Sequence, residues 1–144
     1  MKMRLEITDN NKVVDDTFLT WLLEQVQTTC LTEVNVAKLD KWSVFLTESQ
    51  SIPRLYSDRQ YSAQDLILEG IHNLEIKRNN SSKFVIQIDP RCTAKGYDRL
   101  NLASVCKLIN YGNTELPGCH IFTNTFDKIL KKLPQYVTYY YGGL

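Results

Sequence analysis

The chain has 144 residues, of which 17 are Lys or Arg and 16 are Asp or Glu, so its formal net charge is +1. This length is typical of a single domain, which we expect to span residues 1–144 around one core. The near-neutral balance argues against tight electrostatic binding of duplex nucleic acid, and a hydrophobic content of 43% argues against disorder. No apolar run approaches the roughly 20 residues that cross a bilayer, so no membrane contact is expected.

The first residues, 1–6, lack the apolar stretch of a signal peptide, which indicates synthesis and residence in a reducing cytosol. In that compartment the four cysteines are expected to be free thiols: Cys30, Cys92, Cys106 and Cys119.

The N-terminal part begins with an alternating segment. Residues 1–8 place Met3, Leu5 and Ile7 on one face, which predicts a strand, and the polar residues 9–12 predict a turn. From Val14 onward apolar residues recur at helical spacing as far as Cys30, and this predicts a helix.

The segment 31–51 is ambiguous. Residues 38–42 could extend the preceding helix, whereas residues 43–47 resemble a strand, and both readings stay open. Residues 51–54 contain a proline that breaks whatever precedes it.

A second helix is expected after Ser62, because Ser62 and Asp65 have the spacing of a capping pair. A β-hairpin should follow, since apolar and polar residues alternate on both sides of the polar turn 79–82. Residues 89–90 end the hairpin, and the segment 91–99, with little apolar character, predicts an exposed loop.

Two further segments have helical periodicity. Residues 102–111 should form a helix with Asn101 as its N-cap and Gly112 at its end. After the turn 112–118, residues 121–133 form a second amphipathic run, which Pro134 is expected to close.

The C-terminal segment 136–141 is rich in strand formers, so we expect a strand there, followed by a loose terminus. The elements together predict an α+β fold, with a small, mainly antiparallel sheet and a central hairpin packed against three to four helices.

The chain offers few candidates for chemistry. Cys119 and His120 are adjacent, but no Cys-x-x-Cys pair accompanies them, and neighbouring side chains seldom point at each other. Asp15 and Asp16 are explained by helix capping, and the loop 89–96 lacks the spacing of a phosphate-binding motif. We therefore expect no enzyme activity, no cofactor and no metal.

Two surfaces are better candidates. Lys128, Lys131 and Lys132 fall on the polar side of the last predicted helix and are candidate DNA-facing residues. A terminal strand with tyrosines on both faces needs cover on both, and a neighbouring subunit could supply that cover.

One stretch resembles a known family. The pattern Val105-x-x-Leu108-Ile109-Asn110-Tyr111-Gly112-Asn113-Thr114, then Pro117 and Ile121-Phe122-x-x-x-Phe126, is similar to the tail-completion or neck proteins of tailed bacteriophages, also called head–tail connector proteins. In that family a helix ends in an aromatic residue, glycine and threonine, and a proline-bearing turn leads to a final phenylalanine-containing segment. The similarity covers residues 62–133, about half of the chain.

The resemblance implies a structural virion protein that forms a ring at the head–tail junction, as a neck, tail-completion or tail-terminator protein. Such rings hold six copies commonly and twelve in some relatives, contact portal or tail-tube proteins, and let DNA pass without reading its sequence. The protein would be assembled in the host cytoplasm and reside in the virion. The residues expected at subunit contacts are Tyr111, Gly112, Phe122, Tyr136, Tyr139, Tyr140 and Tyr141. The alternative is a small nucleic-acid-binding module with a basic and tyrosine-rich face.

Overall fold

A computed structural model of the chain describes residues 3–9, 14–36, 38–48, 61–80, 82–95 and 97–142. Residues 10–12 of the turn expected at residues 9–12, the break at residues 51–54 and the last two residues of the chain lie outside these ranges.

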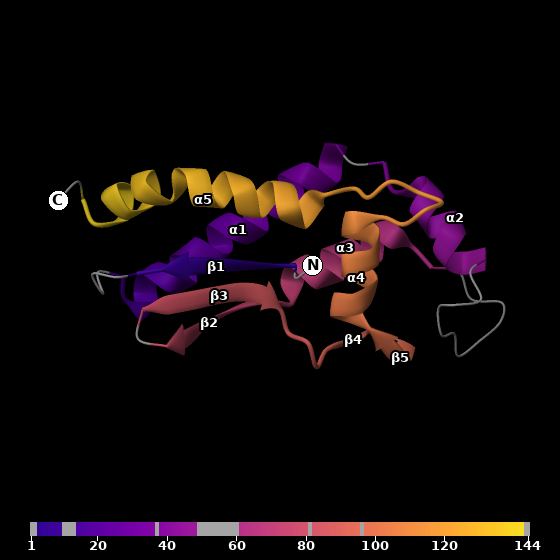
Figure 1. The fold of residues 1–144 in the computed structure, drawn as a ribbon, viewed down its shortest axis with the longest axis horizontal. Helices are drawn as coiled ribbons and strands as arrows, with labels where there is room; N and C mark the ends of the chain where they lie inside the picture. The colour runs from indigo at the N-terminus through magenta and orange to yellow at the C-terminus, as the bar shows by residue number, and fades with distance from the viewer. Residues whose placement is uncertain are drawn as a thin grey trace.

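The centre of the fold is a three-stranded antiparallel sheet of order β1-β3-β2 (Figure 1). Its strands are β1 (Arg4–Thr8), β2 (Leu74–Asn80) and β3 (Lys83–Ile88). Leu5 of β1 pairs with Ile86 of β3, which in turn pairs with Ile76 of β2. The predicted N-terminal strand and the predicted hairpin are therefore both confirmed.

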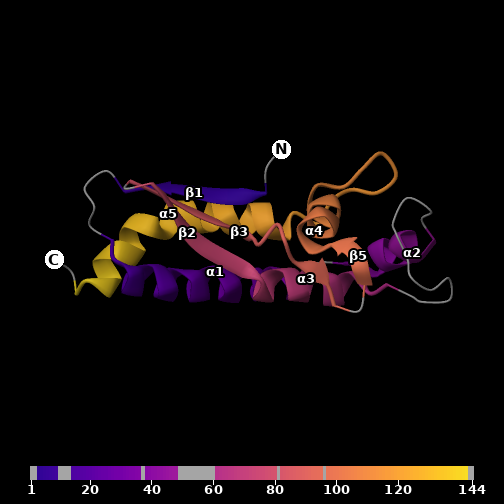
Figure 2. The ribbon, with the colours of Figure 1, turned by 90° about the horizontal axis from the view of Figure 1, so that it is seen from below.

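One face of this sheet forms the core, because side chains along a strand alternate between its two faces. Leu5, Ile7, Phe84 and Ile86 are all buried. Helices α1 (Asp16–Val36) and α5 (Ile121–Tyr140) pack against each other and against strands of the sheet, on one side of it, as Figure 2 shows. No helix in the described ranges is both long and apolar enough to cross a membrane.

Helix α1 begins where the sequence predicted it. The backbone N–H of Phe18 donates a hydrogen bond to the Asp15 carboxylate at 2.9 Å, so Asp15 caps the first turn. The apolar stripe that follows is buried, with Phe18, Leu22, Val26 and Cys30 at no more than 1% exposure. These buried residues are among the apolar residues whose spacing predicted the helix.

The ambiguous segment is helical. Helix α2 (Asp40–Glu48) buries Trp42 and Leu46, which are one helical turn apart. The Ser43 hydroxyl accepts a hydrogen bond from the backbone N–H of Ala63 at 2.8 Å, which joins α2 to the start of α3. Tertiary packing thus decides what local propensity left open.

Two helices have the caps that the sequence predicted. Helix α3 (Ala63–His72) starts at Ser62, whose hydroxyl accepts from the backbone N–H of Asp65 at 3.2 Å. Helix α4 (Leu102–Tyr111) starts at Asn101, whose side chain accepts from the N–H of Ser104 at 2.9 Å, and it ends at Gly112 with φ at 81°.

The prediction of an exposed loop at residues 91–99 is wrong in part. This segment contributes a second, two-stranded sheet of β4 (Thr93–Ala94) and β5 (Tyr97–Asn101). Ala94 and Leu100 are 2% and 4% exposed, so two apolar side chains are enough to fix the segment on the core.

The C-terminal prediction is also wrong. Helix α5 does not close at Pro134 but continues through it to Tyr140, so residues 136–141 form no strand. The described ranges therefore contain five helices instead of three to four, and the α+β class with a small antiparallel sheet is confirmed.

Candidate assembly surfaces

The tyrosine-rich segment is helical because α1 supplies it with aromatic partners. Strand propensity depends on the surroundings, and here a helix lets successive turns of α5 pack on Phe18 and Trp21. Pro134 lacks the N–H that an interior helical position uses, and the Thr138 hydroxyl donates to the Pro134 carbonyl at 3.1 Å. Figure 2 shows the last turns of α5 bending toward the start of α1.

These rings form one cluster, which we call the aromatic end. Its members are Phe18, Trp21, Tyr136, Tyr139, Tyr140 and Tyr141. Trp21 meets Tyr136 edge-on at 5.4 Å between centroids and lies nearly parallel to Tyr139 at 6.0 Å. An aromatic pair in such a geometry contributes about 0.5–1.5 kcal/mol beyond the area it buries, and the pair with the exposed Tyr139 falls at the lower limit of that range.

A hydrogen-bonded pair closes this end. The Tyr141 hydroxyl accepts from the backbone N–H of Asp15 and donates to the Asp15 carboxylate, both at 3.2 Å. Partial desolvation, together with the neighbouring Asp15 carboxylate, raises the pKa of Tyr141, so the phenol keeps its proton and can donate. The residue that follows α5 is thereby tied to the residue that caps the start of α1.

The chain itself supplies most of the cover that the tyrosines were expected to need. Tyr136, Tyr140 and Tyr141 are half-buried against the chain's own α1. Tyr139 is different, because its side chain is 77% exposed although one face of the ring lies along Trp21. One uncovered aromatic ring therefore remains at this end.

The opposite end of α5 is joined to α4 by the turn 112–118. Gly112 and Pro117 form an isolated bridge across the turn, and the N–H of His120 donates to the Asn110 carbonyl at 3.0 Å. A Cβ at Gly112 would lie 2.3 Å from the backbone nitrogen of Gly118, so the two arms of the turn approach as closely as glycine allows. The turn predicted from the sequence is thus a tightly closed unit.

Asn110 is a residue whose role sequence reasoning missed. Its side-chain oxygen accepts from the backbone N–H of Phe122 at 3.0 Å and of Thr123 at 3.4 Å, which caps α5. His120, the residue at the N-cap position, has φ at 57° and makes no side-chain cap. The signal was a polar residue next to Ile109 on the apolar side of a predicted helix, because a buried amide needs a hydrogen-bonding partner.

The predicted contact residues of this turn divide into two kinds. Phe122 is fully buried within its own chain and has no surface that a neighbouring subunit could contact. The prediction that Phe122 lies at a subunit contact is therefore wrong. Tyr111 and Gly112 are half-buried and lie at the edge of the unit.

A groove borders this turn on the side of α2. The Trp42 indole N–H donates to the Pro117 carbonyl at 3.0 Å, which holds α2 and the turn together. The groove between them has a volume of about 200 Å³ and is lined by Lys38, Lys41, Trp42, Leu116, Pro117, Gly118 and Cys119. No local pattern in the sequence predicts this groove, because α2 and the turn are more than 60 residues apart.

The three candidate DNA-facing lysines are all exposed on α5. Lys128 forms an ion pair with Glu33 of α1. Lys131 and Lys132 extend into solvent beyond it and are the two of the set with no ion pair recorded in the described ranges.

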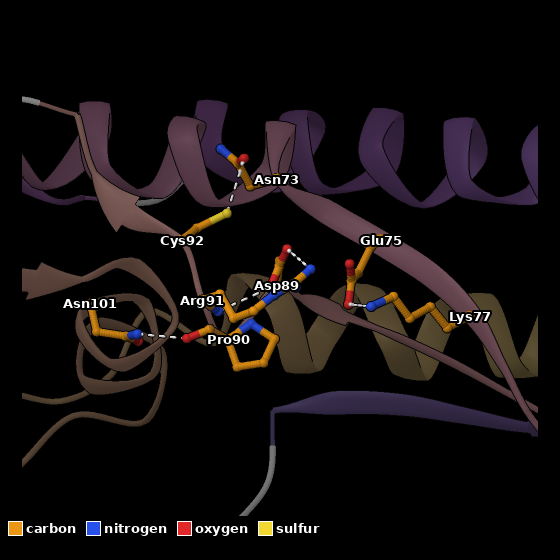
Figure 3. A network of polar contacts seen from close by, with 8 residues as sticks. All are labelled: Asn73, Glu75, Lys77, Asp89, Pro90, Arg91, Cys92 and Asn101. Carbon is orange, nitrogen blue, oxygen red and sulfur yellow. Dashed lines mark hydrogen bonds and ion pairs between the residues drawn. The ribbon is translucent and has the colours of Figure 1, made fainter.

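The polar groups of the loop 89–96 bond mainly to one another and to neighbouring elements (Figure 3). The backbone N–H and the guanidinium of Arg91 both donate to Asp89, and these bonds hold the pKa of Asp89 below its usual range. The amide of Asn101 donates to the Pro90 carbonyl at 2.8 Å, so the loop is fastened to the start of α4.

All four cysteines are free thiols, and three of them lie in environments that disfavour the thiolate. Burial raises the pKa of Cys30 to about 11 and also raises those of Cys106 and Cys119. A nucleophilic or metal-binding thiol needs the opposite shift. Among the described residues, no three His, Cys, Asp or Glu side chains gather closely enough to hold a metal ion.

No protein-family model matches the chain, and neither a curated protein nor a solved structure matches it.

Proposed function

We propose that this chain is a structural virion protein of a tailed bacteriophage, one subunit of a ring at the head–tail junction. Its place would be that of a neck, tail-completion or tail-terminator protein. Its neighbours would be other copies of itself and portal, connector or tail-tube proteins.

The observation that supports this proposal most is the unit formed by the residues of the resemblance. Gly112 ends α4 at positive φ, and Pro117 bridges back to it. Phe122 and Phe126 then anchor α5 in the core, with their rings 6.4 Å apart. Every position named in the resemblance from Gly112 onward thus belongs to one connected junction between two helices.

A ring subunit performs no chemistry, and its binding energy comes from surface buried between copies. The aromatic end and the α2 side of the turn are the surfaces offered for this. DNA would pass the ring without sequence readout, and the exposed Lys131 and Lys132 would contribute local positive charge to a chain of net charge +1.

Light scattering coupled to size exclusion, followed by electron microscopy, tests the proposal. We expect closed rings of one fixed copy number, or rings formed on capsids or tails. A strict monomer at every concentration that also fails to join capsids or tails would overturn it.

A nucleic-acid-binding module is the second candidate, and one observation favours it. Because α5 is helical, Lys128, Lys132 and Tyr139 lie along one stripe of its surface. Filter binding of single- and double-stranded oligonucleotides across a salt series tests this, with K131E/K132E as the variant. Absence of binding at low salt removes the module reading and leaves the ring proposal intact.

A further inference from the structure

We propose that the aromatic end of one copy docks, head to tail, into the groove between α2 and the turn 112–118 of the next copy. This inference rests on the proposed ring, and it names the two surfaces that would meet in it. The occupant of the groove is a second copy of this chain, anchored by Tyr139.

The two surfaces lie at opposite ends of the molecule. Figure 1, which has the longest axis horizontal, places the end of α5 at one extreme and α2 at the other. A contact between two different surfaces of identical subunits repeats from copy to copy, and it closes into a ring when the rotation allows. A contact of the aromatic end with itself would instead stop at a dimer.

Tyr139 has the properties of an anchor residue. Its ring is 77% exposed, yet stacking on Trp21 holds one face of it in place. A rigid, pre-positioned tyrosine loses little side-chain freedom on binding, and tyrosine is among the residues that most often dominate interface energies.

The groove matches this anchor in size and chemistry. It is open to solvent, with a volume of about 200 Å³, and Trp42, Leu116 and Pro117 give it an apolar lining. Lys38 and Lys41 stand at its border as exposed cations. A cation beside the face of an aromatic ring attracts it electrostatically.

Charge around the two surfaces is complementary. Asp15 and Asp16 are exposed at the start of α1, and Asp15 is bonded directly to the aromatic end through Tyr141. The charged groups that line the groove are the two lysines, Lys38 and Lys41, while Glu115 lies in the turn beside them. Opposed charges of this kind set the register and orientation of a contact more than its strength.

Charge reversal in two separate populations tests the docking. Asp16→Lys places like charges at every contact between D16K copies, and Lys41→Glu does the same between K41E copies. A mixture of the two variants restores opposite charges at every contact of an alternating assembly. We expect each variant alone to assemble at least about tenfold more weakly than wild type, and the equimolar mixture to recover within about twofold.

The matched controls are Asp127→Lys in the middle of α5 and Lys107→Glu on α4, both exposed residues away from the two surfaces. These should assemble like wild type. If the controls weaken assembly as much as D16K and K41E, or if the mixture recovers nothing, the docking proposal is wrong.

Cross-linking tests the contact even where it is weak. Gln135→Cys, an exposed position one helical turn before Tyr139, in one population and Lys38→Cys in another should yield more covalent dimer under mild oxidation when the two are mixed than either gives alone. Each variant alone gives the background from the native thiols, including Cys119 at the groove. No excess dimer in the mixture overturns the proposal.

The two proposals fail in different ways. Rings that form normally from D16K or K41E alone would refute this docking mode and leave the ring proposal standing. A wild-type chain that forms neither rings nor cross-linked dimers, and joins no capsid or tail, would refute both.

Discussion

The two ends of α5 differ in how their contacts are made. At its start, backbone atoms meet so closely that a Cβ on Gly118 would lie 2.2 Å from the Asn110 carbonyl oxygen. At its far end the contacts are made by the side chains of α5, as rings that pack on α1 and as the Tyr141 hydroxyl bonded to Asp15, and Tyr139 remains mostly in solvent. The close backbone contacts at the start of α5 fix the conformation of the turn and stabilise the fold. The exposed ring of Tyr139 at the far end is available for binding.

The largest effect should come from Gly112→Ala. Gly112 and Gly142 both have positive φ, at 81° and 75°, but only Gly112 has backbone atoms where the new Cβ would go. We expect Gly112→Ala to lower the free energy of unfolding by about 4 kcal/mol and Gly142→Ala by about 1 kcal/mol, since the second carries backbone strain alone.

Urea denaturation followed by circular dichroism measures both variants. Equal losses for the two glycines would mean that strain alone matters, and that the closed turn is looser than described.

Next in size is the loss of the buried cap. Asn110→Ala removes the acceptor for two N–H groups at the start of α5, and water cannot replace it at Phe122, which is fully buried. We expect a loss of about 2–3 kcal/mol. Asn101→Ala removes the cap of α4, where Asn101 is only half-buried, and should cost about 1 kcal/mol in the same denaturation experiment.

The ranking of these two caps is the informative result. If Asn101→Ala proves the more damaging, the α4–α5 junction is not the rigid part of the molecule.

The aromatic end should separate stability from assembly. Trp21→Ala removes a half-buried ring that contacts Tyr136, Tyr139 and Tyr140, so we expect a loss of about 2 kcal/mol. Tyr139→Ala should change stability by about 0.5 kcal/mol or less, because that ring is already mostly exposed. Thermal unfolding at a concentration too low for assembly measures both, and a large loss for Tyr139→Ala would assign Tyr139 to the fold instead of to binding.

The smallest effect concerns Asp89. Its pKa is lowered in the folded chain by the hydrogen bonds from Arg91, so the carboxylate contributes stability above its unfolded pKa of about 3.9. That contribution is lost as the pH falls through the folded pKa. Asp89→Asn should therefore lower the urea midpoint slightly at pH 7, and the difference from wild type should shrink as the pH falls below 4. A difference that stays constant with pH would contradict this origin.

The sequence predicted what depends on local pattern and caps. The hairpin, the caps at Ser62 and Asn101 and the end of α4 at Gly112 each follow from a few neighbouring residues. These features need little information from the rest of the chain.

The features that could not be predicted from the sequence depend on contacts with residues far away in the chain. The helical state of residues 136–140 needs Phe18 and Trp21 of α1, and the groove needs Trp42 to meet Pro117. A proline and a run of tyrosines favour another structure when read locally, and only the packing reverses that preference.

The most direct test of the account is sedimentation velocity of the wild type and of Tyr139→Ala over the same range of concentrations. We predict that wild type forms one large, closed species of fixed mass, and that Tyr139→Ala remains mainly monomeric while unfolding at an unchanged temperature. Identical distributions for the two proteins would contradict the claim that the exposed ring at the end of α5 joins one copy to the next.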